Sequence, residues 1–86
     1  MNQEVYLVLG HVEDIYQNEF LGIFTTTEKA ENFCNKEIEA FGDKNPYSKI
    51  TIHPIGLDEA FDYSFAEKTV SKFLKNPETG LLEFSA

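Results

Sequence analysis

The clearest pattern of apolar and polar positions lies between residues 26 and 41. Apolar side chains recur there at intervals of three and four residues, which is typical of a helix with one buried face. These apolar positions are Ala30, Phe33, Cys34, Ile38 and Phe41. Thr25 is placed to cap the first turn, Glu28 to complete a capping box, and Gly42 to end the helix in a left-handed conformation. The pattern predicts one main helix over residues 26–41.

Three segments around this helix have the composition of strands. Residues 4–10 carry β-branched and aromatic side chains on both faces, which predicts a central strand. A loop over residues 11–18 leads to a second strand over residues 19–24, in which Gly22 is the expected site of a bulge. Residues 47–55 alternate apolar and polar side chains, which predicts a half-exposed third strand, and Pro54 marks the end of its pairing or an edge.

The connection between the second and third strands fixes the expected topology. Because the helix joins them, a right-handed crossover places the third strand parallel to the second and antiparallel to the first. The predicted strand order is therefore 3-1-2.

The C-terminal region has two competing interpretations. Residues 68–75 and 80–84 flank a turn in which Pro77 suits the first central position and Gly80 the left-handed residue. This arrangement favours a C-terminal hairpin, whereas the apolar residues between 61 and 74 also approximate the stripe of a second helix over residues 64–75. With the hairpin, the chain is expected to form one α+β domain over residues 1–86, with a small sheet packed against the helix.

The composition supports an ordered core in a reducing compartment. Apolar residues make up 42% of the chain and aromatic residues 14%, which is too rich for a disordered segment. Cys34 lies on the apolar stripe of the helix, so we expect a buried thiol. The longest apolar run, over residues 5–9, is too short to cross a membrane. We therefore expect a cytoplasmic protein without a membrane partner.

The charge of the chain is strongly acidic and unevenly distributed. The net charge is −8, and residues 1–43 account for −7 of it, with nine acidic residues and two lysines. The absence of arginine argues against direct nucleic-acid binding and favours a partner protein with a basic surface. The carboxylates expected to contact such a partner are Glu13, Asp14, Glu19, Glu28, Glu31, Glu39 and Asp43. The alternative explanation of this acidity is solubility alone.

No group of residues has the spacing of a catalytic, metal or cofactor site. His11 lies beside Glu13 and Asp14 in what we expect to be a solvated acidic loop, without the paired ligands of a metal centre. His53 is expected to be a surface histidine, since no nucleophile is recognisably paired with it. The carboxylates within residues 58–62 lack an apolar enclosure, and no glycine-rich phosphate loop is present. We therefore expect neither an enzyme nor a cofactor.

Three short motifs carry a family resemblance over residues 4–58. A Val5–Val8 strand, a Gly22–Thr25 strand end and a Thr27–Glu31 helix start resemble a class of small uncharacterised bacterial and phage proteins. The resemblance implies an accessory protein that acts by binding, and it carries over no catalytic residues. The expected function is inhibition or modulation of a host defence or nucleic-acid-handling protein through the acidic face.

Two further expectations concern other partners. The alternative function is a small-ligand or nucleotide-binding module, with a pocket between the helix and the loop over residues 11–18. The open edges of a short sheet also permit a homodimer through the second strand or the C-terminal hairpin.

Overall fold

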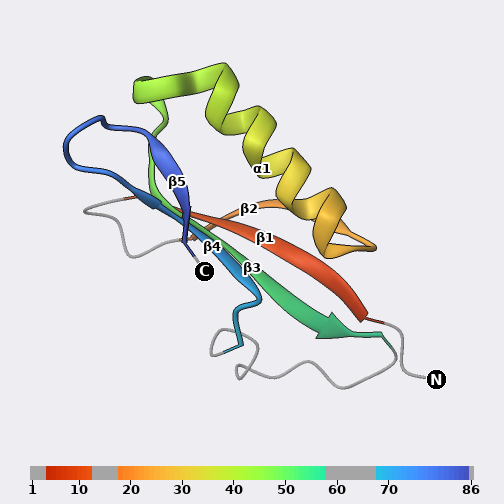
Figure 1. Ribbon diagram of the computed structural model, residues 1–86. Helices are drawn as coiled ribbons and strands as arrows, with labels where there is room; N and C mark the ends of the chain where they lie inside the picture. Colours follow the sequence, from red (N-terminus) through yellow and green to blue (C-terminus); the bar gives the residue numbers. More distant parts are fainter. Residues whose placement is uncertain (1–3, 13–17, 58–67, 86) are drawn as a thin grey trace.

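The protein forms a layer of antiparallel strands with a helix lying across one face (Figure 1). The computed structural model describes residues 4–12, 18–57 and 68–85. Within them, the strands are β1 (Glu4–Val12), β2 (Asn18–Phe24), β3 (Tyr47–Gly56), β4 (Ser71–Lys75) and β5 (Leu82–Ser85). The helix α1 (Thr27–Phe41) continues directly into a short 3-10 helix, η1 (Gly42–Lys44). The predicted α+β class is confirmed.

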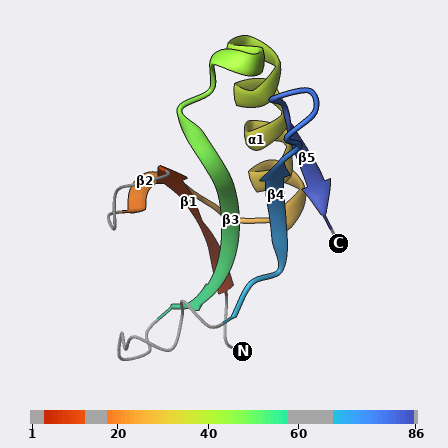
Figure 2. The ribbon, with the colours of Figure 1, turned by 90° about the vertical axis from the view of Figure 1, so that its left-hand side faces the viewer.

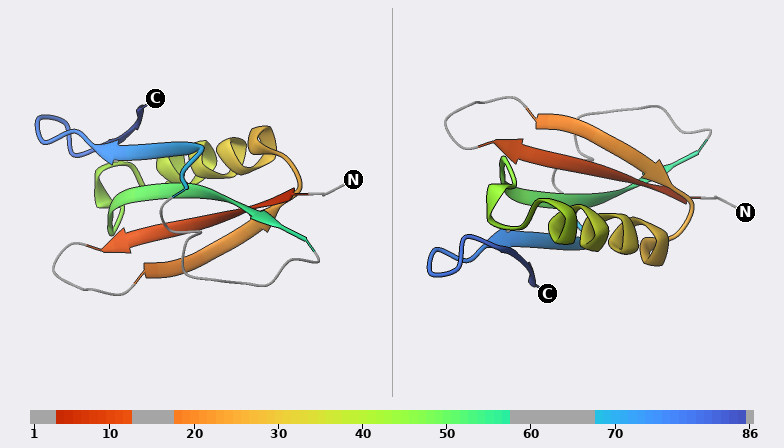
Figure 3. Two further views of the ribbon diagram at one scale, coloured as in Figure 1. Left: turned by 90° about the horizontal axis from the view of Figure 1, so that it is seen from below. Right: turned by 90° about the horizontal axis from the view of Figure 1, so that it is seen from above.

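The five strands lie in the order β2-β1-β3-β4-β5, and every neighbouring pair is antiparallel (Figure 3). The first three strands therefore have the predicted order, with β3 antiparallel to β1. The predicted hairpin forms from β4 and β5 and extends the sheet on the far side of β3, a position that the sequence pattern left open. The competing helix is wrong for residues 71–75, which are strand, while residues 64–67 lie outside the described residues. The homodimer remains a prediction, with β2 and β5 at the two edges of this sheet.

The central position of β1 follows from its apolar residues on both faces. Leu7, Val8 and Leu9 are 4%, 0% and 8% exposed, and successive strand residues point to opposite faces. Along the pairing with β2, Val8 lies opposite Gly22 and Leu9 opposite Phe20. Leu21 is therefore the extra residue of a β-bulge. The bulge lies beside Gly22, the expected site, which itself pairs with Val8.

The helix begins one residue later than predicted. The capping side chain belongs to Thr26, whose hydroxyl oxygen accepts a hydrogen bond of 3.1 Å from the backbone N–H of Lys29. Thr25 instead accepts a hydrogen bond from the Lys29 ammonium, so the predicted capping box with Glu28 is wrong. Three consecutive threonines offer the same capping chemistry, and the backbone conformation selects among them. Gly42 ends the helix with φ 54°, as predicted.

One face of α1 packs on the sheet. Ala30 and Cys34 are fully buried there and belong to the cluster that contains Val8, Ile52 and Phe73. The Phe24 and Phe33 rings add a contact between β2 and α1, with their centroids 5.2 Å apart. Phe41, expected on the buried stripe, is the last residue of α1 and is 49% exposed. Figure 2 shows α1 on one side of the sheet.

The Tyr47 side chain of β3 packs against Gly10 of β1. A Cβ atom added to Gly10 would lie 2.6 Å from Cε1 of the Tyr47 ring, so the ring occupies the space that any other side chain would need. The Tyr47 hydroxyl donates a hydrogen bond to the Glu19 carboxylate on β2. Burial and this carboxylate raise the pKa of Tyr47 to about 12, so the phenol remains a donor at neutral pH. This side chain thus spans three strands.

The first prediction concerns this close approach. We expect Gly10→Ala to lower the free energy of unfolding by about 1–3 kcal/mol, because the methyl group overpacks the Tyr47 ring. Urea unfolding of the wild type, Gly10→Ala, Tyr47→Ala and the double variant provides the measurement. Without the ring, Gly10→Ala should cost much less, giving a coupling energy above about 1 kcal/mol. Strictly additive effects would show that the contact does not exist.

The second prediction concerns the buried thiol. Cys34 is fully buried, and burial, followed by the charges of Glu31 and Glu37, raises its pKa to about 12. At pH 8 only about one thiol in ten thousand is then ionised, so we expect Ellman's reagent to modify native Cys34 at least about 100-fold more slowly than the unfolded chain. The matched control is Lys36→Cys in a Cys34→Ala background, which places a thiol on the exposed side of α1. Equal rates for the two native thiols would contradict the prediction.

Candidate functional site

The predicted acidic face divides into three groups in the structure. Glu13 and Asp14 lie outside the described residues. Glu19 lies on β2, three of the carboxylates lie on α1, and Asp43 lies in η1. The two carboxylates that make internal hydrogen bonds are Glu19 and Glu31, and the exposed ones along α1 and η1 are Glu28, Glu39 and Asp43.

Glu19 and Glu31 connect elements of the fold. The Glu19 carboxylate accepts the Tyr47 hydroxyl and so links β2 to β3. The Glu31 carboxylate accepts a hydrogen bond of 2.6 Å from the Ser71 hydroxyl, which links α1 to β4. Glu31 is half-buried in this position. These two side chains are therefore committed to internal contacts, although the sequence placed them with the exposed carboxylates.

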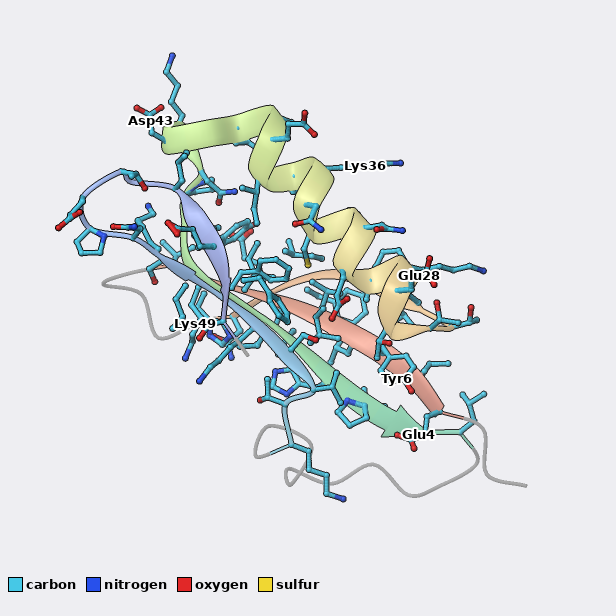
Figure 4. All side chains as sticks on the ribbon, viewed as in Figure 1. Glu4, Tyr6, Glu28, Lys36, Asp43 and Lys49 are labelled. Carbon is cyan, nitrogen blue, oxygen red and sulfur yellow. The ribbon has the colours of Figure 1, made fainter. Side chains whose placement is uncertain are left out.

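The other three carboxylates, which we call the helix carboxylates, are Glu28, Glu39 and Asp43. All three are exposed, and none accepts a side-chain hydrogen bond from another described residue. Glu28 and Glu39 are eleven residues apart, which is about three turns, so they lie on the same side of α1. Figure 4 shows Glu28 near the start of the helix and Asp43 at its far end. Together they follow the length of the outer helix surface.

Lysines moderate the charge of this surface. Lys29 and Lys36 are exposed on α1, and Figure 4 shows the Lys36 side chain pointing away from the sheet. Residues 27–44 contain five acidic residues and three lysines, a net charge of −2. The helix surface is therefore acidic without being a continuous field of negative charge.

A second group of polar residues lies on the sheet face opposite α1, where the sequence predicted an exposed strand surface. Thr51 and His53 are only 5% and 3% exposed, so the expectation of a surface histidine is wrong. β3 is buried on both faces over residues 50–53 and is not half-exposed. Strand alternation places these two residues opposite the helix-facing Ile50 and Ile52. Only the register with β1 brings His11 to the same place, so no local sequence signal could have found the group.

The Thr51 hydroxyl connects two histidines. Its oxygen lies 2.8 Å from Nε2 of His11 and 2.8 Å from Nε2 of His53. The other ring nitrogen of His53, Nδ1, lies 2.7 Å from the backbone carbonyl oxygen of Lys68. These contacts join β1, β3 and the segment that enters β4. We call the three side chains the His–Thr–His group.

The electrostatic surroundings of His11 disfavour its protonation. Burial lowers the pKa of His11, the neighbouring Lys49 lowers it further, and His53 adds a smaller effect in the same direction. A hydrogen bond with the Asn18 side chain opposes these effects. His11 therefore holds its proton less tightly in the folded protein than in the unfolded chain.

The described residues contain no cluster of three or more histidine, cysteine or carboxylate side chains that could hold a metal ion. The expected small-ligand pocket beside residues 11–18 involves residues 13–17, which lie outside the described residues, so this alternative remains a prediction. None of the helices among the described residues has the length and apolar character needed to cross a membrane.

The lowered pKa of His11 generates the third prediction. Since the folded protein binds this proton less tightly than the unfolded chain, the stability contributed by neutral His11 is complete above about pH 6.5 and is lost as the pH falls below it. We expect the free energy of unfolding of the wild type to decrease below about pH 6.5 relative to His11→Gln, by at most about 1.4 kcal/mol per pH unit. Urea unfolding across this range measures the difference. Parallel pH profiles of the two proteins would contradict the prediction.

Comparison with known protein families, with curated proteins and with solved structures found no match for this chain.

Proposed function

We propose that the protein is a non-enzymatic binding domain that contacts a basic surface of a partner protein through the helix carboxylates. The observation that carries the proposal is the division among the acidic residues. Glu19, although exposed, and half-buried Glu31 accept hydrogen bonds within the fold, whereas Glu28, Glu39 and Asp43 are exposed and accept no side-chain hydrogen bond from other described residues. Solvent-exposed carboxylates without internal partners remain available for a cationic surface.

The net charge of −8 supports attraction over distances beyond direct contact. A cationic partner is attracted until salt screens the field, with a Debye length of about 8 Å at physiological ionic strength. Such attraction mainly increases the association rate and the specificity for basic partners. Binding of this kind should weaken steeply as the salt concentration rises.

The charge density of α1 argues for a protein contact made of a few ion pairs. The interval from Glu28 to Glu39 is about 16 Å of helix, over which one strand of B-DNA carries about five phosphates. The same interval of α1 holds four carboxylates, of which only Glu28 and Glu39 are exposed, and Lys29 and Lys36 lie among them. Replacement of nucleic acid on a basic partner would therefore be partial, and other contacts must contribute affinity.

An exposed aromatic ring offers such a contact. Phe41 is 49% exposed at the end of α1, between Glu39 and Asp43 in the sequence. Binding surfaces commonly combine an aromatic anchor with a polar rim, because burial of the ring supplies affinity and the charges supply orientation. The proposed contact is therefore centred on the C-terminal end of α1, and its partner is a basic host protein, such as one that handles nucleic acid.

The fourth prediction tests this surface by affinity capture from bacterial lysate. The test variant combines Glu28→Gln, Glu39→Gln and Asp43→Asn, which changes the net charge from −8 to −5. We expect the intact protein to retain a basic protein at about 0.05 M salt and to release it by about 0.5 M salt, and the variant to retain less than a tenth as much.

The matched control removes three exposed carboxylates elsewhere. Glu4→Gln, Glu78→Gln and Glu83→Gln give the same net charge, because these residues lie on β1, in the β4–β5 turn and on β5. The control should capture the partner nearly as well as the intact protein. Equal losses in both variants would assign binding to net charge alone, and unchanged capture by both would contradict the proposed surface.

A further inference from the structure

The hydrogens of the His–Thr–His group can be assigned by counting donors and acceptors. The Lys68 carbonyl oxygen only accepts, so Nδ1 of His53 must carry the hydrogen of their 2.7 Å contact. When His53 is neutral, its Nε2 is therefore an acceptor, and the Thr51 hydroxyl donates to it. The Thr51 oxygen then accepts from His11, so the hydrogen of neutral His11 lies on Nε2. With both imidazoles neutral, the two rings are held in opposite tautomers.

One added proton leaves the three contacts His11–Thr51, Thr51–His53 and His53–Lys68 in place. A proton on Nδ1 of His11 does not alter the bond from His11 Nε2 to Thr51. A proton on Nε2 of His53 makes that nitrogen the donor, and the hydroxyl of Thr51 then turns and donates to His11, which takes the other tautomer. In both cases the hydroxyl oxygen accepts from one ring and donates to the other.

After a second proton is added, the Thr51 hydroxyl can no longer donate to either ring. Both Nε2 atoms then carry hydrogen and point at the same oxygen, 2.8 Å away from each. The Thr51 hydrogen loses both of its acceptors at a position that is only 5% exposed, and no other described side chain bonds to this hydroxyl. An unpaired buried donor is costly, and two positive rings now share one oxygen.

Lysines are paired with residues of the His–Thr–His group in the sheet. Lys49 lies opposite His11 across the β1–β3 pairing, and Lys72 of β4 lies opposite Thr51. Lys68 supplies the carbonyl bonded to His53 and carries a further positive charge. The acidic residues within 13–17 and 58–67 lie outside the described residues, so the inference is drawn from the hydrogen-bond count of the hydroxyl and not from the total charge.

We propose that His11, Thr51 and His53 form a pH-sensitive latch, in which the Thr51 hydroxyl admits one proton to the histidine pair, and the second proton leaves the hydroxyl hydrogen without an acceptor and weakens this contact between β1 and β3. The His53 Nδ1–H donates to the Lys68 carbonyl in each of these protonation states, so the segment that enters β4 stays attached to His53. This inference is independent of the proposed partner surface on α1.

The fifth prediction is tested by nitrogen NMR of isotopically labelled protein. Imidazole nitrogen shifts report both the tautomer and the protonation of each histidine. Above about pH 8 we expect the hydrogen of His11 on Nε2 and that of His53 on Nδ1. On acidification the pair should take up its two protons in steps separated by more than about 1 pH unit, because the first proton disfavours the second.

Two variants test whether the Thr51 hydroxyl causes the separation of the two protonation steps. Thr51→Ser keeps the hydroxyl and should keep the separated steps, whereas Thr51→Val removes it and should bring the steps closer by at least about 0.5 pH unit. The same separation in the serine and valine variants would overturn the latch, as would the same tautomer for both histidines in the wild type at high pH. The tautomer measurement needs no variant, so the proposal stays testable if Thr51→Val fails to fold.

Discussion

The fold depends on one constraint: β1 and β3 carry buried side chains on both faces, and α1 covers only one of those faces. Val8 and Ile52 pack beneath the helix, while Leu7 and Leu9 are buried on the opposite side. Thr51 and His53 share that opposite side, so their polar atoms must find partners within the protein. The His–Thr–His group satisfies this requirement with hydrogen bonds that span β1, β3 and the approach to β4.

Hydrogen bonds between side chains attach the outer elements to this centre. Glu19 reaches Tyr47 across the space left by Gly10, and Glu31 reaches Ser71 at the junction of α1 and β4. Glu31 is half-buried by its contact, whereas Glu19 stays exposed while it holds Tyr47. The acidic side chains without such a contact, Glu28, Glu39 and Asp43, lie along α1 and η1.

The helix carboxylates belong to α1 and η1, and Figure 1 shows α1 on one face of the sheet. Strand alternation places the His–Thr–His group on the opposite face. A partner bound to the outer side of α1 would not touch the buried histidines. The proposed partner contact and the proposed proton uptake therefore involve separate parts of this fold.

The sequence by itself determined the elements and much of their order. The spacing of apolar residues specified α1, and the crossover through that helix placed β1 between β2 and β3. Pro77 with Gly80 favoured the C-terminal hairpin over a competing helix. Each of these is a local signal, or a rule of connection between neighbouring elements, that does not depend on distant contacts.

Tertiary structure decided which polar residues are buried and which charges are free. Strand alternation assigned His53 to the face opposite α1, but it did not reveal that this second face is also buried. His11 and Thr51 are forty residues apart and meet only through the β1–β3 register. The same holds for Glu31, which became a structural side chain when β4 came to lie beside α1. Local periodicity determines the face of the strand or helix on which a side chain lies. Only the packing of distant segments determines which residues that side chain contacts.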